Sequence, residues 1–437
     1  MISGLLHYGS GLRRFCGFTI LLCGLISCNE NNPSNYPVVG GPTINGSAIN
    51  GNDAAIDDSD PLSAELTDAL RELVAQYFQQ LESGLADAEN SLVLFQSEVS
   101  SFLLSPGTET MNTIRRGWLD AHSAYELTSL QRYFMAAVLP EPASTDLIQL
   151  QQRINHWPIL PGYIDYVEGY PGSGIVNDIT VRMAIPSLRQ QHSAFDLAEA
   201  TLGFHVVEFL LWGANSDKIS LRPASDFELV EQLTERQLDG GVELVQIPNN
   251  RRRQLLALTV QAILEDFHSM QLLWNEHKSV ALASQQTASG ARLLNLMTRS
   301  ITDMLQEELL IASLYPLLNG NFVDSVQSPF SHSTQNAVIA KLSGVERFLL
   351  ESTSDFEMTL DAALLKVSTD FGEFFYRSFD SSKECLVLLY SDIETPGDPA
   401  AGRQAEFDIV ECINLLTNMI DHLSRIETTI IQSNESL

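Results

Sequence analysis

The sequence lacks the short motifs by which several hydrolase classes are recognised. It contains no HExxH, and the inverted form HxxEH fails because Phe209 stands where the second histidine is needed. A GxSxG nucleophile motif is also absent, and the nearest approach, GSG at residues 172–174, has no strand pattern before it. No CxxC pair or cysteine-rich metal spacing occurs. These absences exclude the usual zinc-peptidase motifs and argue against serine-hydrolase chemistry.

Basic residues are scarce. The 437-residue chain has 25 lysines and arginines against 55 acidic residues, which is a formal net charge of −30. Residues 1–27 hold two of the arginines and no acidic residue, so the charge of the remaining chain falls from −30 to −32. Such a chain is a poor partner for nucleic acid and for anionic lipid surfaces. Its acidity has two interpretations: solubility, which is the simpler, and a field that concentrates cations.

The apolar run near the start of the chain is too short to span a membrane. It covers Phe15–Ile26, about a dozen residues, where a spanning helix needs roughly 20. Arg13 and Arg14 precede it and LISC, ending at Cys28, follows it, which is the layout of a secretory signal. LISC resembles the bacterial lipoprotein box, in which the cysteine becomes the lipidated first residue. The alternative is an ordinary signal peptide that is cut nearby.

We therefore expect a signal peptide over residues 1–27 and a lipid on Cys28. The protein would lie in the bacterial cell envelope, at the outer membrane or the periplasmic face, and contact the membrane through the lipid only. Residues 28–60 are rich in Asn, Gly, Pro, Ser and Asp and predict a flexible linker. Cys385 and Cys412 are the cysteines that remain in the body and favour one disulfide, with two buried free thiols as the alternative.

The body of the chain reads as helical. Leu66, Leu70, Leu73, Tyr77 and Leu81 recur at spacings of three and four and form one helical stripe. Alternating strand patterns are nearly absent, and only the segment 158–182 has enough Gly and Pro to be an irregular excursion. We expect an all-α architecture of two helical bundles, residues 61–240 and 241–437. Further helices are expected at about 108–138, 144–155, 185–213, 226–238, 250–282, 288–316, 333–351, 355–379 and 403–432.

The stretch GFHVVEFLLWG, residues 203–213, places two polar groups in an apolar helical run. At three residues apart, His205 and Glu208 lie on adjoining parts of one helix face and both side chains can address a common point. An imidazole nitrogen and a carboxylate oxygen are suitable ligands for iron or zinc. A histidine and a carboxylate that only satisfy each other in a core are the alternative. Gly203 is expected to let another backbone or a ligand approach closely.

Other pairs of histidine and acidic residues are weaker evidence for a metal site. Glu265 and His268 form an ExxH pair, but di-iron bundles need two such pairs, and these two residues read as part of a solvated helix face. His192, Asp196 and Glu199 form a stripe that points away from His205 on the same expected helix.

Three tryptophans and one aspartate also stand out in the sequence. Trp118, Trp157 and Trp212 stand among apolar residues and are expected to pack in the core. Asp165 lies in the irregular segment, where functional groups are frequent, and is a candidate to reach a cleft.

Four separated blocks resemble the imelysin-like family, which includes imelysin peptidase, iron-regulated protein A and the C-terminal domain of periplasmic iron-uptake components. GFHVVEFLLWG resembles the GxHxxE signature of the family. The other blocks are IRRGWLDAHSAYELT (114–128), RINHWPILPGYIDYVEG (153–169) and LRPASDF (221–227). The resemblance covers roughly residues 65–355. It implies two helical bundles, with the GxHxxE helix lining a cleft between them.

The resemblance also implies an exported protein associated with metal handling. It makes His205 and Glu208 the first candidate metal ligands, with Gly203 shaping their helix. Glu126 and Glu308, in helices that match more loosely, are candidate oxygen ligands. The chain departs from the family in PFSHSTQN, where His332 replaces an acidic position.

The function expected on this basis is capture or delivery of a metal ion. Iron is the first candidate, zinc and copper are alternatives, and an iron-transport protein is a possible partner. A metallopeptidase with Glu208 as general base is a second interpretation. A non-catalytic binding module that takes another ligand is a third.

Overall fold

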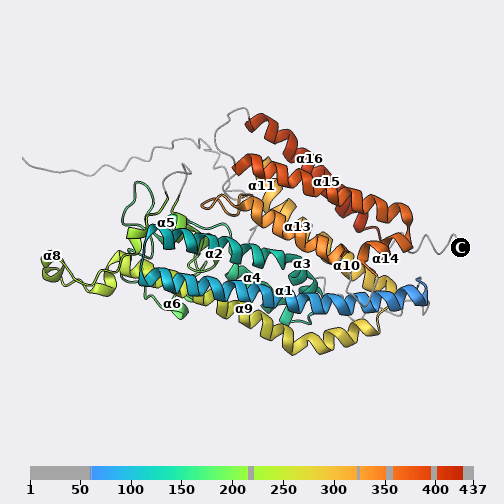
Figure 1. Cartoon of the computed structure of the whole chain (residues 1–437), viewed down its shortest axis with the longest axis horizontal. Helices are drawn as coiled ribbons and strands as arrows, with labels where there is room; N and C mark the ends of the chain where they lie inside the picture. Colours follow the sequence, from blue (N-terminus) through green and yellow to red (C-terminus); the bar gives the residue numbers. More distant parts are fainter. Residues whose placement is uncertain are drawn as a thin grey trace, which may run out of the picture. The chain divides into compact units, whose positions relative to one another are not determined.

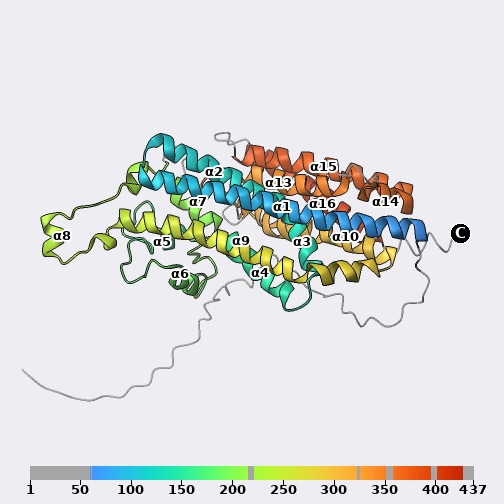
Figure 2. The same ribbon diagram turned by 60° about the horizontal axis from the view of Figure 1, so that its bottom comes forward.

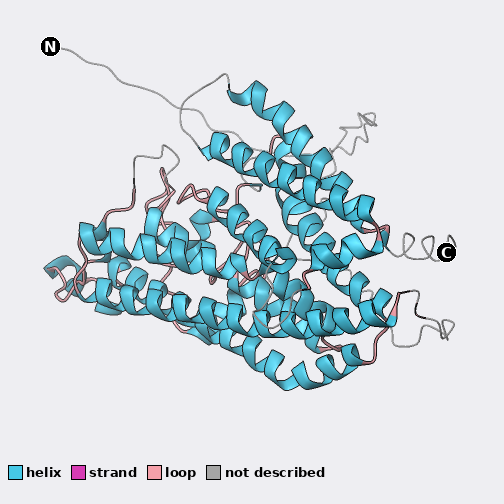
Figure 3. Cartoon of the chain, turned by 45° about the vertical axis from the view of Figure 1, so that its right-hand side comes forward, coloured by secondary structure: helices cyan, strands magenta, loops and turns pink. Residues whose placement is uncertain are grey.

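The computed structural model describes residues 60, 62–214, 221–321, 325–350, 358–394 and 401–426. The expected signal peptide, Cys28 and nearly all of the expected linker lie outside the described residues. Within the described part of the chain, all named secondary-structure elements are helices (Figure 3). Strand-type backbone pairing there is limited to one isolated bridge between Val167 and Tyr170. The expected all-α class is confirmed.

The helices account for most of the expected segments. Where the sequence predicts one helix over 108–138, the chain breaks at Thr128, and where it predicts one over 355–379, a described break falls at Ser368. A π-helical segment, η3, joins α10 to α11 without a loop. The elements are α1 (Ala64–Leu104), α2 (Thr108–Leu127), α3 (Ser129–Val138), α4 (Ala143–Ile154), α5 (Pro161–Ile164), α6 (Ile185–Gln191), α7 (Phe204–Trp212), η1 (Ala224–Phe227), α8 (Glu235–Asp239), η2 (Leu244–Gln246), α9 (Pro248–Gln286), α10 (Gly290–Met304), η3 (Leu305–Leu314), α11 (Tyr315–Leu318), α13 (Thr334–Leu350), α14 (Leu360–Val367), α15 (Thr369–Glu394) and α16 (Ala401–Leu423).

Long helices pack side by side around a shared apolar core. The leucines and tyrosine of the expected α1 stripe are all buried. In Figures 1 and 2, α1 lies between α2 and α9, and the helix contacts agree. In Figure 1, α13, α15 and α16 follow one another on the other side of α2. Because α9 packs along α1, α4 and α7, helices from both sides of the expected boundary near residue 240 share contacts. The division into two domains stays a prediction.

The C-terminal helices form a hairpin that is joined covalently. Cys385 of α15 and Cys412 of α16 form a disulfide, which is the pairing that the sequence favoured. α15 packs against α13, and α16 packs against η3. Among the described residues, no helix combines the length and the apolar character that a membrane crossing requires.

The irregular segment around 158–182 is held against α9 by buried arginines. Arg251 donates hydrogen bonds to backbone carbonyls of this segment, among them those of Ile175 and Val176 at 2.7 and 2.8 Å. Asp165 is fully buried between two guanidinium groups, with 2.9 Å to Arg222 and 2.5 Å to Arg252. The oxygens of Asp165 are therefore committed to ion pairs that fasten the segment, rather than to a cleft.

The prediction of one continuous helix over 185–213 is wrong for the residues between Gln191 and Phe204. α6 ends at Gln191, an irregular stretch follows, and α7 begins only at Phe204. Local hydrogen bonds replace the helix: Ser193 adopts a positive φ of 53°, and His192 Nδ1 accepts from the Thr201 N–H at 3.2 Å. The expected helix over 226–238 is likewise replaced by two short pieces, η1 and α8. The stripe expected from His192, Asp196 and Glu199 does not exist, because they are not on a helix.

His192 makes stability sensitive to acid. Burial, with the nearby His156 and Arg153, lowers the pKa of His192 to about 3, whereas the ordinary value is 6.5. The unfolded chain therefore binds a proton below pH 6.5 that the folded chain refuses, so the stability contribution is complete above pH 6.5 and is lost as pH falls toward 3. We expect wild type to lose about 2 kcal/mol from this group between pH 7 and pH 5.

The variant that isolates this effect is His192→Asn, whose carbonyl oxygen can accept from the Thr201 N–H. Urea unfolding at pH 7 and pH 5 should show a smaller acid loss in the variant than in wild type. Equal losses in both chains would contradict the assignment to His192.

Candidate metal centre

The residue that precedes α7 is a glycine because only glycine fits there. Gly203 has φ +105°, and a Cβ at this position would lie 2.9 Å from the carbonyl oxygen of Arg153 and 3.1 Å from that of Ile154. The start of α7 therefore rests directly on the end of α4, as the sequence suggested for Gly203. This contact sets the start of α7 against the C-terminal end of α4, which Asn155 caps.

Replacing Gly203 with alanine is expected to lower the free energy of unfolding by about 3 kcal/mol, because strain at positive φ adds to the clash with α4. Gly169→Ala is the matched control: its φ is +80° and a Cβ there meets nothing within 4 Å, so only the strain of about 1 kcal/mol applies. Chemical unfolding of both variants measures the difference. Equal losses would show that the contact with α4 costs nothing.

His205 and Glu208 face each other inside the protein. His205 Nδ1 lies 3.0 Å from Glu208 Oε2, and the two side chains are 1% and 0% exposed. The other glutamate oxygen, Oε1, accepts from the N–H of Phe330 at 3.1 Å and from the N–H and hydroxyl of Ser331 at 2.8 and 2.7 Å. Both oxygens of Glu208 are therefore engaged, and the carboxylate joins α7 to the loop before α13. We call His205 and Glu208 the histidine pair.

The second nitrogen of His205, Nε2, differs from Nδ1 in its hydrogen bonding. In the described part of the chain, Nε2 of His205 is buried and has no hydrogen-bond partner. Burial lowers the pKa of His205 well below its usual value, so the imidazole is neutral. Burial raises the pKa of Glu208 to about 7, against the hydrogen bonds from Ser331 and Phe330 that lower it. When Glu208 is ionised, it accepts a hydrogen bond from the Nδ1–H group of His205. The neutral ring then carries its lone pair on Nε2.

Aromatic rings surround the histidine pair. The ring of Trp157 lies 5.1 Å from that of His205, centroid to centroid, and Trp118 lies 6.4 Å away. Trp118 and Trp212 are buried, as expected, and Trp118 Nε1 donates to the carbonyl of Phe204 at 2.9 Å. Trp157 is only half-buried and borders the site, so the core role expected for it is incomplete.

Glu126 and Glu308 meet at a lysine. Lys341 Nζ lies 2.8 Å from Glu308 Oε2 and 3.6 Å from Glu126 Oε1, and its side chain is 2% exposed. Arg132 approaches the other oxygen of Glu126 at 3.5 Å. Burial raises the pKa of Glu126, but Lys341, His122 and Arg132 outweigh burial and hold that pKa well below its usual value. We call Glu126, Glu308, Lys341 and Arg132 the lysine cluster.

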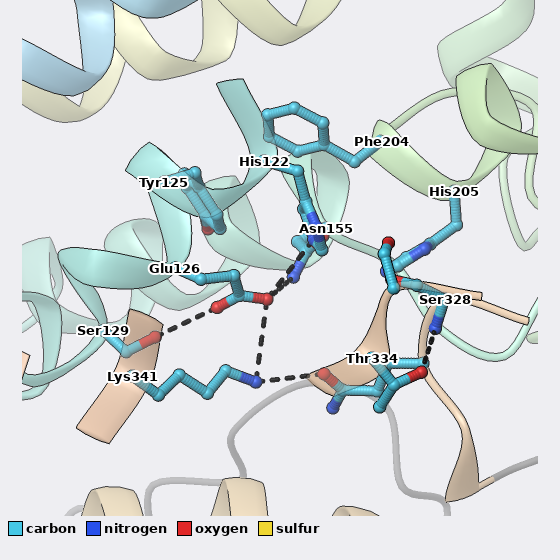
Figure 4. Close-up of polar contacts among 12 residues, drawn as sticks. His122, Tyr125, Glu126, Ser129, Asn155, Phe204, His205, Ser328, Thr334 and Lys341 are labelled. Atoms are coloured by element: carbon cyan, nitrogen blue, oxygen red, sulfur yellow. Dashed lines mark hydrogen bonds and ion pairs between the residues drawn. The ribbon is translucent and has the colours of Figure 1, made fainter. Parts of the chain in front are cut away.

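His122 connects the histidine pair to the lysine cluster. Its Nε2 lies 3.1 Å from Asn155 Oδ1 and 3.4 Å from Glu126 Oε1, and its ring lies 5.3 Å from that of His205. Asn155 also donates to Glu126 at 2.8 Å. Figure 4 shows this arrangement, with His122, Glu126 and Lys341 on one side and His205 on the other. The four residues proposed as ligands from sequence thus lie in two adjoining groups.

The arrangement contains one nitrogen that is ready to bind and no complete metal cage. Among the described residues, no three histidine, cysteine, aspartate or glutamate side chains are placed to hold an ion together. His205 Nε2 suits a metal, because a ligating histidine usually donates its other N–H to a carboxylate, as His205 does to Glu208. The two candidate oxygen ligands, Glu126 and Glu308, are paired with Lys341 instead.

Sequence reasoning missed several members of the site. His122 and Asn155 lie within the quoted blocks 114–128 and 153–169, which drew attention through their tryptophans and tyrosines. In PFSHSTQN the resemblance singles out His332, whereas the neighbouring Ser331 makes the contact with Glu208. Lys341 had no sequence signal. Glu265 and His268 lie on the surface as expected; the side chain of His268 is 62% exposed.

The comparisons with known proteins agree with the blocks that the sequence contains. No curated protein matches the chain significantly. A solved structure from Parabacteroides distasonis, described as an iron-regulated protein A precursor, superposes with a TM-score of 0.56 over 86% of this chain and 98% of its own, at 12% identity. At that identity the likeness shows a shared fold alone. The family model of imelysin, peptidase family M75, matches residues 58–405, which include α7 and the lysine cluster, and the chain therefore belongs to the imelysin family.

Proposed function

We propose that this protein binds an iron ion as its cargo, with Nε2 of His205 as the nitrogen ligand. The observation that carries the proposal is the state of this one atom. It is buried, it has no partner among the described residues, and its ring is oriented by a carboxylate. Several other buried side-chain atoms of the described residues also lack a hydrogen-bond partner, among them Gln151 Nε2 and Thr259 Oγ1. His205 Nε2 stands apart from these because its ring is neutral and its other nitrogen is paired with a carboxylate, which is the arrangement of a ligating histidine. Glu208 then acts as the positioning partner of His205.

We propose that Glu126 and Glu308, which His122 and Lys341 connect to the His205 side of the site, complete the ligand set. A mixed set of imidazole and carboxylate ligands suits iron and also accepts zinc. In the present arrangement Lys341 neutralises both carboxylates, so cargo binding requires that the lysine move away.

We propose a place in the cell envelope on the basis of the N-terminal sequence pattern. A lipid on Cys28 and the expected linker over residues 28–60 would hold the body at the outer membrane or the periplasmic face. The net charge of −30 would favour the approach of cations. We propose that the captured iron passes to a transport partner.

The geometry supports binding over hydrolysis. A metallopeptidase needs a base with a free oxygen beside the metal-bound water. Glu208 is the residue expected in that role, yet it accepts one hydrogen bond on Oε2 and three on Oε1. It is therefore engaged in holding His205 and the Ser331 loop.

The experiment is a titration of the full-length chain with Fe²⁺ under anaerobic conditions, repeated with Zn²⁺ and Cu²⁺. Wild type should bind one ion. His205→Ala should bind it at least about 100-fold more weakly, because losing a direct ligand should lower the affinity more than losing a residue that only orients a ligand. His268→Ala, at an exposed histidine, is the matched control and should bind as wild type does. Equal binding in His205→Ala and wild type would refute the proposal, and metal-dependent peptide cleavage by wild type would favour the peptidase interpretation.

A further inference from the structure

Lys341 is a buried cation between two buried or half-buried carboxylates. Its ammonium contacts Glu308 at 2.8 Å and Glu126 at 3.6 Å, and it donates to Gln327 Oε1 at 3.0 Å. Lysines are rarely buried unless they are paired, and here the pairing partners are the same carboxylates that could bind cargo. Figure 4 shows the Lys341 ammonium below Glu126, with a dashed line joining the two groups.

The two cations of the lysine cluster are held differently. Arg132 is fixed by hydrogen bonds to the Tyr125 hydroxyl at 2.6 Å and to Ser129 at 2.7 Å, and its guanidinium stacks 3.9 Å above the Tyr125 ring. Lys341 is a compact charge on a flexible four-carbon chain, held by ion pairs and one amide oxygen. Lys341 is therefore the cation that can leave, while Arg132 stays.

α13 brings Lys341 to this place through close packing. At Gly344, one turn after Lys341, a Cβ would lie 2.5 Å from the carbonyl oxygen of Leu127, so α13 rests directly on the end of α2. The loop that precedes α13 supplies Ser331, which binds Glu208. One continuous segment of chain thus contacts both the histidine pair and the lysine cluster.

We infer that Lys341 is an exchangeable internal cation, which holds Glu126 and Glu308 until an incoming metal ion takes its place beside Nε2 of His205. This inference rests on the proposed function. The unpartnered, buried Nε2 is an independent sign of a ligand position. His122 links it to the carboxylates, because its ring lies 5.3 Å from that of His205 and its Nε2 lies 3.4 Å from Glu126 Oε1. Lys341 competes with the cargo, so it lowers the affinity and makes release possible. The cluster also stays neutralised when no metal is bound.

The test compares metal affinity in full-length wild type, Lys341→Met and Lys341→Arg, with Fe²⁺ under anaerobic conditions and with Zn²⁺ as a redox-inert probe. Lys341→Met removes the competing charge and should bind about 10- to 100-fold more tightly, within the usual range of coupling between two ligands. Lys341→Arg keeps a cation and should bind no more tightly than wild type. Lys278→Met is the matched control, because Lys278 pairs with Glu82 at 2.9 Å on the surface. It should bind as wild type does.

The outcomes separate the two proposals. If wild type binds metal and Lys341→Met binds it equally or more weakly, the exchange inference is wrong while the proposed function stands. If neither chain binds metal, both are wrong. If only Lys341→Met binds metal, Lys341 does stand in for a cation, but the natural chain does not capture metal at this site. Should Lys341→Met not fold, Lys341→Gln tests the same loss of charge with a polar side chain.

Discussion

Replacing Asp165 with alanine is expected to lower the free energy of unfolding by about 3–5 kcal/mol, the range for breaking a buried ion pair by removing one partner. Asp165 is fully buried and lies between Arg222 at 2.9 Å and Arg252 at 2.5 Å. Without the carboxylate, the guanidinium groups of Arg222 and Arg252 remain buried but lose the negative charge that they share. The irregular segment around 158–182 would lose its ion pair with α9 and keep its backbone hydrogen bonds with Arg251.

Urea unfolding of the full-length chain measures this loss, and Asp68→Ala is its control. Asp68 pairs with Arg71 at 2.7 Å on the surface of α1, where its side chain is 73% exposed, so its removal should cost about 0–1 kcal/mol. A loss at Asp165 no larger than that at Asp68 would contradict a structural role for this network. It would return Asp165 to the candidates for a binding role.

Glu208→Gln is expected to weaken metal binding about 10- to 100-fold, the usual effect of changing the partner that orients a ligating histidine. An amide offers one acceptor oxygen and one donor nitrogen, whereas all four contacts of Glu208 are with donors when the carboxylate is ionised. If the amide nitrogen turns to His205, it donates to Nδ1, the ring proton moves to Nε2, and the metal-binding lone pair is lost.

The measurement is the same anaerobic titration, with Glu65→Gln as the matched control at an exposed position in the first turn of α1. Unchanged affinity in Glu208→Gln, together with a lost site in His205→Ala, would mean that His205 binds metal without help from Glu208. Loss of the site in both variants to the same extent would mean that the lone pair on Nε2 depends entirely on Glu208.

Much of the fold follows from apolar spacing, and its failures have local causes. The α1 stripe, from Leu66 to Leu81, is buried because an amphipathic helix of this length has only one face to bury. The segment after Gln191 contains good helix formers, yet tertiary contacts such as His156 Nε2 with the Leu197 carbonyl hold it in an irregular form. Periodicity does not report such contacts, so the sequence predicted a helix there.

The site was predictable in part for the same reason. Spacing places His205 and Glu208 on one helix face, and the two interpretations offered by the sequence coexist: Nδ1 is satisfied by Glu208, and Nε2 has no partner among the described residues. Lys341 was not predictable, because in VIAKLSG it is one charge among apolar residues. Its partners, Glu126 and Glu308, are distant in sequence and come together only in the folded chain.

Iron X-ray absorption on the iron-loaded full-length chain tests most directly the claim that Nε2 of His205 binds the cargo. We expect scattering from an imidazole ring in wild type, and the loss of one imidazole contribution in His205→Ala. His268→Ala should leave the spectrum unchanged. The same imidazole scattering in wild type and His205→Ala, or none in wild type, would contradict the claim.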